Sequence, residues 1–582
     1  MDYEITPERK KYIEARGLTV LTACPGSGKT TSIAYKLGKL AELKSNRVIC
    51  LSFTNNAVSE LSDTFTALHG LRPSFPHKIS TIDSFLSQFI VLPFWYLING
   101  LKARPSILDN THNTPIYDRH YEKNGKEYTC FYMRLSQQQK DYYYKHRENE
   151  FSIIAPNTYC CGNKLIDSEE GREVAQLIIK RRLQLGILTS SDVEYFAYDI
   201  LSKHPDISKA LSMRFDYMIM DEAQDMSKMQ FEIINLLINA GLSNVELVGD
   251  LRQSIYAWRN AHPELFKSLL SDNRWKQLRF VDNRRSTQII IDQYNKIKEP
   301  QDPNIKSHNV DSLGLPIYVY HYDDDKGLDV IQHFSCQCNG YKLHNLKVIC
   351  RGNDQLKELT GNSNIVSCWK SEIPLLILKS FNEFSNGEFS DSIKTLKHVL
   401  SFINEESKRK DFASSFSYID QNPLDVSCLI QFLRNLPTIS LTIEEWQNKT
   451  ERLIEQHFNF ENGAIDFQIK KKMDGYVMKA VKLTRVCDFF NFRGSNSLSL
   501  ISTVHKVKGL TYDACLVFLK KKQSTNLSLE LFSQCDDLKE TQRLLYVACS
   551  RPRQLLALAI PKSISKAKID KYVNSGYLYI EI

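Results

Sequence analysis

The segment TACPGSGKTT, residues 22–31, is compatible with few folds. Its glycine backbone N–H groups can curl around phosphate oxygens, a lysine supplies an ammonium group for them, and a threonine hydroxyl can bind Mg²⁺. The segment follows the apolar run LTVLT and precedes SIAYKLGKLAEL, whose apolar residues recur at helical spacing. It therefore predicts a strand, a Walker A phosphate-binding loop and a helix, with Ala23 where the common pattern has its first glycine. The predicted loop comprises Ala23, Cys24, Pro25, Gly26, Ser27, Gly28, Lys29, Thr30 and Thr31.

Short apolar segments that end in polar loops form two series along the chain. The first series is LTVLT (18–22), RVICLSF (47–53), DYMIMDEAQD (216–225) and VELVGD (245–250). The second is PIYVYHY (316–322), KVICRGN (347–353), ACLVFL (514–519) and LLALAI (555–560). Apolar strands that alternate with helical patterns favour parallel sheets covered by helices, with ligands at the carboxyl ends of the strands. The expected fold class is therefore α/β, with two such domains.

Two long segments interrupt these series. Residues 88–203 exceed what one sheet needs, and their polar, aromatic-rich sequence is expected to be mainly helical. Residues 355–497 include DSIKTLKHVLSFI, whose apolar residues share one helical face and are expected in a core. The expected domains are 1–87 with 204–282 for the first, 283–354 with 498–582 for the second, and the insertions 88–203 and 355–497.

The amino-acid composition and the apolar runs indicate which class of protein this chain belongs to. The chain has 582 residues, 42% of them hydrophobic and 24% charged, which is ordinary for a globular protein of several domains. No apolar run approaches the roughly 20 residues of a membrane span, and the charged start MDYEITPERKKYIEARG differs from a signal peptide. We therefore expect a cytoplasmic protein without a membrane partner. The net charge of +8 permits a polyanionic partner but does not require one.

Two close cysteine pairs raise the question of a metal centre. Cys160–Cys161 and Cys336–Cys338 could be half-sites for zinc or an iron–sulfur cluster. Neither pair has the C-x₂-C spacing or a clear second half-site, so the sequence favours reduced, buried thiols over a metal.

The run MIMDEAQD supplies carboxylates at the end of an apolar strand. Asp221 can hold the Mg²⁺ that Thr30 also contacts, and Glu222 can orient or deprotonate an attacking water. If Asp221 only capped the start of a helix, that role would explain the presence of the aspartate but not the other residues of MIMDEAQD. Together with the Walker A loop, the run predicts hydrolysis of a nucleoside triphosphate.

Nine segments together resemble the motifs of the UvrD/Rep/PcrA-like superfamily 1A DNA helicases. They are ACPGSGKT, LSFTNNAVSEL, STIDSF, MDEAQD, VGDLRQSIYAWRNA, DNRRSTQII, VICRGNDQ, STVHKVKGLTYDA and QRLLYVACSR, in the family's order and over roughly half the chain. The resemblance implies two RecA-like P-loop domains, each with an accessory insertion, and ATP with Mg²⁺ as cofactors. It also implies movement along single-stranded DNA, 3′ to 5′, and unwinding of tailed double-stranded DNA.

The resemblance also assigns roles to individual residues. Gln253 would sense the γ-phosphate, and Arg285 and Arg551 would reach it from the second domain, which suits a planar, permanently charged guanidinium group. Aromatic residues at loop tips would stack on bases, although Phe53 and Trp258 taken singly are more often core residues. The DNA-contacting positions implied are Phe53, Thr54, Asn55, Tyr256, Trp258, Arg259 and His505.

Three positions depart from the family's pattern. Arg9 stands where the family has an adenine-reading glutamine, Asp83 stands where it has a histidine that contacts DNA, and Thr511 replaces a ribose-contacting glutamate. These departures put adenine recognition, one DNA contact and one ribose contact in doubt. They leave the hydrolytic residues unchanged.

A second function, of another class, is a regulatory DNA-sensing ATPase subunit. The phosphate loop, short N-terminus and compact insertions are similar to the helicase-like subunit of the Gabija antiphage system, which works beside a separate OLD-family nuclease. No nuclease signature follows LLALAI, so a helicase–nuclease fusion is not expected. A GTPase is not expected either, because no NKxD guanine motif follows a strand.

Overall fold

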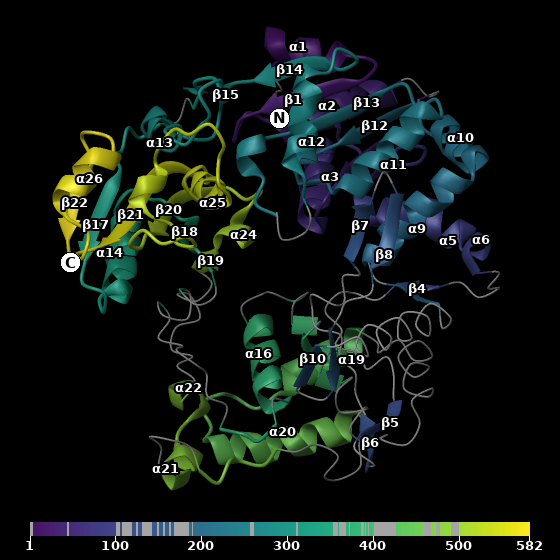
Figure 1. Ribbon diagram of the computed structural model, residues 1–582. Coiled ribbons are helices and arrows are strands. Elements are labelled where there is room, and N and C mark those ends of the chain that lie inside the picture. Colours follow the sequence, from purple (N-terminus) through teal and green to yellow (C-terminus); the bar gives the residue numbers. More distant parts are fainter. Residues whose placement is uncertain are drawn as a thin grey trace. The chain divides into compact units, whose positions relative to one another are not determined.

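The computed structural model describes the chain as two compact units (Figure 1). The first unit comprises Met1–Tyr322, Lys342–Asn345 and Val507–Ile582, and the second comprises Asp323–Tyr341 and Leu346–Lys506. All residues are described except 1–3, 43–45, 100–104, 108–118, 124–125, 131–142, 148–149, 155–157, 162–163, 168–185, 189, 257–260, 310–311, 353–354, 356–358, 360–367, 372, 386–388, 390–391, 394, 398, 401–425, 459–466, 473–477 and 490–499.

The first unit contains a parallel sheet built from the first series of apolar segments. Its strand order is β14-β1-β13-β12-β2-β3, and every neighbouring pair is parallel. The bounds are β1 Thr19–Ala23, β2 Val48–Ser52, β3 Lys78–Thr81, β12 Tyr217–Met220, β13 Val245–Gly249 and β14 Lys276–Phe280. The carboxyl ends of β1, β2, β12 and β13 lead into the predicted motif loops. Parallel pairing therefore brings these loops to one edge of the sheet.

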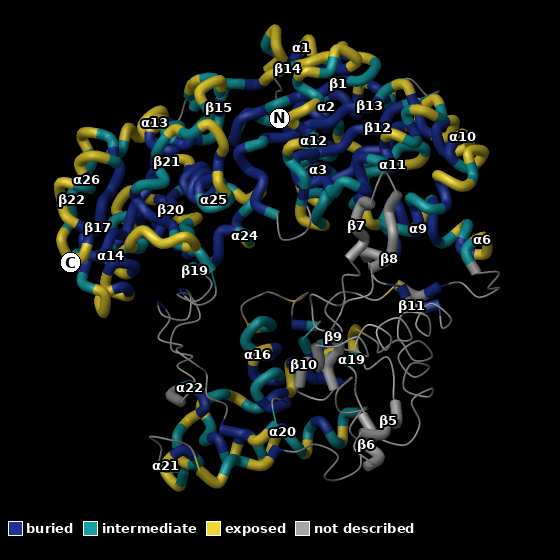
Figure 2. Tube along the Cα trace, viewed as in Figure 1, coloured by how far each residue is buried: buried dark blue, intermediate teal, exposed yellow. Residues whose placement is uncertain are grey.

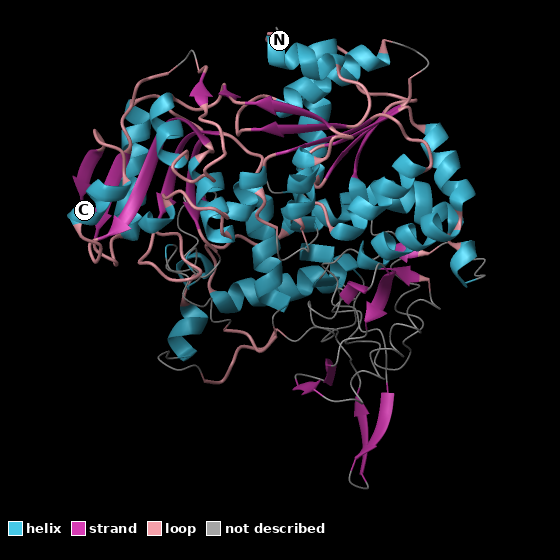
Figure 3. Cartoon of the chain, turned by 45° about the horizontal axis from the view of Figure 1, so that its top comes forward, coloured by secondary structure: helices cyan, strands magenta, loops and turns pink. Residues whose placement is uncertain are grey.

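Helices cover both faces of this sheet because its strands are apolar on both sides (Figures 2 and 3). Along β1, Val20 packs into one core and Leu21 into the other. Along β12, Met218 and Ile219 divide in the same way, as the two-residue period of a strand requires. The helices of this region are α1 Pro7–Glu14, α2 Lys29–Ala41, α3 Asn55–His69, α4 Ile82–Phe85, α9 Ser190–Lys203, α10 Pro205–Arg214, α11 Lys228–Asn239 and α12 Pro263–Ser268.

The first unit also holds four strands of a second parallel sheet, in the order β20-β21-β17-β22. Their bounds are β17 Tyr318–Tyr322, β20 Tyr512–Phe518, β21 Pro552–Pro561 and β22 Leu578–Glu581. The accompanying helices are α13 Gln288–Tyr294, α25 Glu540–Cys549 and α26 Lys566–Tyr572. The predicted α/β class with two RecA-like domains is therefore confirmed.

The second unit contains a parallel strand pair and a helical core. β18 (Leu346–Cys350) pairs with β19 (Ile501–Thr503). The predicted apolar face of DSIKTLKHVLSFI is confirmed as core, because Leu396, Val399 and Leu400 are buried in it. The helices are α14 Gly327–Gly340, α16 Ile373–Ser385, α19 Val426–Asn435, α20 Ile443–Phe458, α21 Met478–Leu483, α22 Val486–Phe489 and α24 Val504–Val507, the last ending at the first residue of the other unit.

The insertion 88–203 differs from the mainly helical expectation. Helices α5 (Leu92–Phe94), α6 (Tyr96–Asn99) and α9 lie at its two ends, but antiparallel strand pairs lie between them. These pairs are β5 Arg119–Lys123 with β6 Lys126–Cys130, β7 Tyr143–Arg147 with β8 Glu150–Ile154, and β9 Thr158–Cys161 with β10 Lys164–Asp167. Two residues separate the strands of each pair, including an Asn-Gly pair at 124–125, which is a strong hairpin signal. That local turn signal outweighs the helical interpretation.

Candidate functional site

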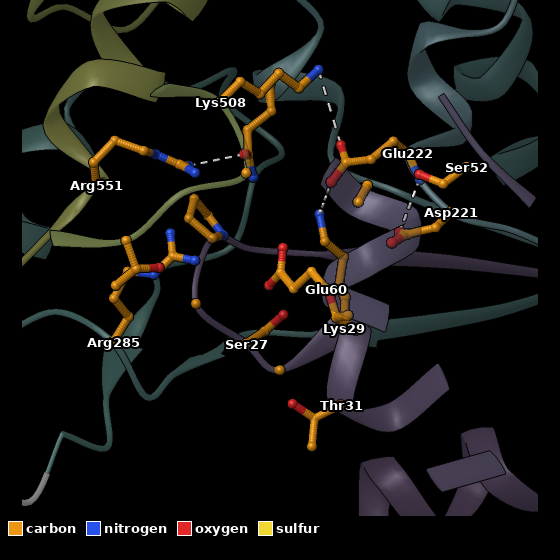
Figure 4. A pocket seen from close by; sticks show the side chains of 18 of the residues that line it. Ser27, Lys29, Thr31, Ser52, Glu60, Asp221, Glu222, Arg285, Lys508 and Arg551 are labelled. Carbon is orange, nitrogen blue, oxygen red and sulfur yellow. Dashed lines mark hydrogen bonds and ion pairs between the residues drawn. The ribbon is translucent and has the colours of Figure 1, made fainter. Parts of the chain in front are cut away.

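The predicted phosphate loop lies between β1 and α2, at the rim of a cavity of about 430 Å³ in the first unit (Figure 4). Gly26 and Gly28 have φ values of 67° and 80°, in the left-handed region that favours glycine. A side chain at Gly26 would also lie 2.5 Å from Cβ of Arg285, which explains the glycine there. The loop carbonyls are held from outside, since Asn283 Nδ2 donates to Pro25 O at 2.7 Å and the Arg284 N–H donates to Gly26 O at 2.8 Å.

The two predicted carboxylates follow β12 directly and both line the cavity. Glu222 has a φ of 56°, an uncommon left-handed conformation for a residue other than glycine. Its Oε1 lies 3.6 Å from Lys29 Nζ, and its Oε2 accepts a hydrogen bond of 2.6 Å from Gln224 Nε2. Burial favours the neutral acid, but the charges of Lys29 and Lys508 outweigh burial and hold the pKa of Glu222 below its usual value. The Glu222 carboxylate is therefore ionised and oriented.

Asp221 has the opposite electrostatic environment. Burial, followed by the negative charge of Glu222, raises the pKa of Asp221 above its usual value. A divalent cation would reverse this shift, and both Asp221 and Thr30 line the cavity as oxygen ligands suited to Mg²⁺. Within the described residues, buried Ser27 Oγ and Lys29 Nζ have no hydrogen-bond partner. These donors fit a nucleotide phosphate with its Mg²⁺.

Both predicted arginines reach the same cavity, together with Gln253. Arg551 is 1% exposed, and its Nη2 donates to Gln253 Oε1 at 3.0 Å. Gln253 Nε2 in turn donates to Asp250 Oδ2 at 2.7 Å. Arg285 Nη1 donates to Ser550 O at 3.3 Å, and burial, followed by the charge of Arg551, lowers the pKa of Arg285 to about 9. Two guanidinium groups thus share one cavity with the phosphate loop.

Lys508 is a cavity residue that the sequence reasoning did not single out. It forms a short ion pair with Asp225, lies 4.0 Å from Glu222 Oε2, and has its Nζ 4.6 Å from the centre of the Tyr256 ring. Figure 4 shows Glu222 between Lys29 and Lys508. Burial raises the pKa of Asp225 to about 6, against the opposing charge of Lys508. Lys508 lies within STVHKVKGLTYDA, one of the nine motif segments, and this position is the sequence signal that could have identified it.

The candidate DNA contacts have several locations. Phe53 and Thr54 line the cavity at the carboxyl end of β2, where Phe53 also packs against the core and Thr54 caps α3 by accepting from the Ala57 N–H. Asn55 is exposed at the start of α3, and Tyr256 lines the cavity. Trp258 and Arg259 lie outside the described residues, and His505 lies on α24 in the second unit.

The three departures from the family pattern also have defined locations. Arg9 is buried beside the phosphate loop, and its Nη2 donates to Ser27 O at 2.9 Å. Thr511 lines the cavity. Asp83 is exposed on α4.

The described residues contain no cluster of three or more histidine, cysteine or acidic side chains able to hold a metal. Cys336 is exposed and Cys338 is buried on α14, since residues two apart on a helix point to different sides. Cys160 and Cys161 belong to β9, and their side chains lie outside the described part of the structure. Every helix in the described part of the chain is too short or too polar to cross a bilayer.

Comparison with known proteins gives matches across most of the chain. The model of the UvrD/REP helicase N-terminal domain matches residues 5–274, and that of the UvrD-like helicase C-terminal domain matches residues 431–563. DNA helicase II of Haemophilus influenzae is 23% identical over 453 residues, which are 76% of this chain and 59% of that protein. The putative ATP-dependent DNA helicase YjcD of Bacillus subtilis is 21% identical over 632 residues, 96% of this chain and 78% of that protein. ATP-dependent DNA helicase PcrA of Leuconostoc citreum is 24% identical over 293 residues, 48% of this chain and 37% of that protein.

Proposed function

Because the chain belongs to the UvrD-like family of ATP-dependent DNA helicases, we propose that it hydrolyses ATP in this cavity to move along single-stranded DNA. The proposed direction is 3′ to 5′, with unwinding of tailed duplexes. The observation that carries the proposal is the Glu222 carboxylate, held ionised between two lysines beside the phosphate loop. A general base must be ionised and fixed before it can act on water.

The residues around Glu222 have different proposed roles in hydrolysis. Lys29 Nζ has no hydrogen-bond partner among the described residues, so it can turn from Glu222 to the phosphate oxygens. Gln224 then keeps the carboxylate oriented toward the attacking water. Mg²⁺ held by Asp221 and Thr30 would supply positive charge to the phosphate oxygens.

The proposed roles of Arg285, Arg551 and Gln253 concern the negative charge that develops on the transferring phosphoryl group. We propose that Arg285 and Arg551 stabilise this charge, an effect typically worth 10²–10³ in kcat for one donor. Arg551 is connected through Gln253 to Asp250, at the carboxyl end of β13. This chain of hydrogen bonds supports a role for Gln253 in sensing the γ-phosphate.

The DNA surface and the domain boundaries belong to the same proposal. We propose that DNA is contacted by Phe53, Thr54, Asn55, Tyr256, Trp258, Arg259 and His505. The boundaries proposed are 1–87 with 204–282, 283–354 with 498–582, and the insertions 88–203 and 355–497. The first sheet supports this division, since it combines β2 and β3 from before residues 88–203 with β12 from after them.

The variant Glu222→Gln tests the assignment of the base. Because its amide cannot take a proton from water, we expect normal ATP binding but loss of DNA-stimulated phosphate release. The control is Glu42→Gln, which alters an exposed carboxylate paired with Lys39. Retained hydrolysis by Glu222→Gln would show that another group activates the water.

A strand-displacement assay on 3′- and 5′-tailed duplexes tests the motor. Unwinding of only the 3′-tailed duplex is expected, whereas unwinding of only the 5′-tailed duplex would contradict the direction. DNA-stimulated hydrolysis without unwinding of either duplex would favour the regulatory ATPase subunit of an antiphage complex, working with a separate OLD-family nuclease. That alternative rests on the sequence resemblance described above.

A further inference from the structure

Arg9 is an arginine buried where the phosphate loop meets the first helix. It lies on α1, is 4% exposed, and donates from Nη2 to Ser27 O at 2.9 Å. Its Nη1 donates to Glu4 O at 3.4 Å, and the guanidinium carbon lies 6.0 Å from the centre of the Phe280 ring. A buried charge is tolerated only when hydrogen bonds compensate for the lost water, so the bond to Ser27 also helps to hold Arg9.

The bond to Ser27 O determines the direction of one N–H group in the phosphate loop. A trans peptide holds its C=O and N–H on opposite sides, so the bond turns the Gly28 N–H away from Arg9. Gly28 precedes α2, has left-handed backbone angles, and has no side chain to cap the helix. The direction of this peptide therefore depends on contacts from outside the loop. Asn283 and Arg284 hold the two preceding carbonyls in the same way, and Arg9 holds the third.

The rest of α1 is anchored firmly enough to keep Arg9 in position. Buried Lys36 of α2 donates to Tyr12 O at 2.7 Å and to Ala15 O at 3.0 Å, the carbonyls at the end of α1. Lys36 Nζ also lies 2.5 Å from Glu246 of β13. The helix that carries Arg9 is thus attached to both the Walker A helix and the sheet.

We propose that Arg9 is a positioning residue for the phosphate loop and acts on the polyphosphate rather than on the base. This inference rests on the proposed function of the cavity as a nucleotide site. Because the Ser27–Gly28 peptide belongs to the loop for the phosphates, which all nucleotides share, we expect Arg9 to contribute equally to the affinity for every nucleotide. We therefore also expect GTP and CTP to be hydrolysed within about an order of magnitude of ATP, because a site that does not hydrogen-bond a base edge discriminates weakly.

The test measures the Kd of ADP, GDP and CDP with Mg²⁺ by calorimetry. Arg9→Met keeps much of the volume but removes the donors, and we expect it to weaken all three nucleotides by a common factor of about tenfold. Arg9→Lys keeps a charge and a donor and is expected to recover part of the affinity. The matched control is Arg16→Met, because Arg16 is exposed and donates to Ile13 O of α1 and to Ala15 O, at the residue that follows α1.

Three results would overturn the inference. A loss confined to ADP would mean that Arg9 reads adenine, and unchanged Kd values with a lowered Tm would mean that Arg9 only stabilises the fold. If Arg9→Lys binds the three nucleotides no more tightly than Arg9→Met, the result contradicts a hydrogen bond as the cause. If Arg9→Met does not fold, the Kd values of Arg9→Lys are compared with those of the unaltered protein instead. Diphosphate binding needs neither hydrolysis nor DNA, so intact wild-type binding without helicase activity would contradict only the proposed function. Absence of wild-type binding would contradict both.

Discussion

Lys508 lies beside two carboxylates, and at the residue scale it adds a second ammonium group to the environment of Glu222. Replacing it with methionine removes one of the charges that lower the pKa of Glu222, so this pKa should rise. A base must be ionised to act, so the acid limb of the ATPase pH profile should move to higher pH. The measurement is kcat of Lys508→Met over a pH range that extends below the usual glutamate pKa of 4.5, because the pKa of Glu222 in the unaltered protein lies at about 2.

The control for this prediction is Lys506→Met, which alters an exposed lysine of the same sequence segment. Its acid limb should coincide with that of the unaltered protein. If the limb of Lys508→Met does not move either, Lys508 does not govern the ionisation of Glu222. A limb that moves to lower pH would contradict the sign of the proposed interaction.

At the scale of elements, α9 and the start of α11 are joined by Glu194. This carboxylate contacts Ser227 Oγ closely and accepts from Gln230 Nε2 at 3.4 Å, next to the capping box that begins α11. Burial raises the pKa of Glu194 to about 7, although its bond to Ser227 opposes the shift. The folded state therefore binds this proton more tightly than the unfolded state. Its stabilising contribution is complete below about pH 4.5 and is lost as the pH rises through about 7.

Glu194→Gln should remove this pH dependence. We expect Tm, measured from pH 5 to 7.5, to fall less with rising pH in the variant than in the unaltered protein. Asp199→Asn, on the same helix and paired with Lys203, should keep the original slope. Parallel slopes for Glu194→Gln and the unaltered protein would contradict the raised pKa.

At the scale of the whole molecule, DNA should be held by its backbone and by base stacking. The net charge of +8 and the candidate aromatic contacts favour binding that does not depend on sequence. The Kd for single-stranded DNA should rise steeply with salt and be similar for mixed-sequence strands of equal length. Fluorescence anisotropy at several salt concentrations measures both. A Kd that is insensitive to salt, or that differs strongly between such strands, would contradict this mode of binding.

Local sequence patterns were sufficient for much of the architecture. The β1 segment, the phosphate loop and α2 were predicted because strand alternation, glycine spacing and helical period all act over a few residues. The helical interpretation was wrong for the described strand pairs of residues 88–203, because the Asn-Gly sequence at 124–125 is a local hairpin signal that a search for helical periodicity does not detect.

The sequence by itself determined the parallel α/β class, the loop that suits a phosphate, and the carboxylates at the end of β12. Only the tertiary structure decided which side chains surround them. Arg9 meets Ser27 across 18 residues, Arg551 meets Gln253 across 298, and Lys508 meets Asp225 across 283. No periodicity links residues so far apart. Their contacts follow from the packing of whole elements, which orders the strands and directs their loops into one cavity.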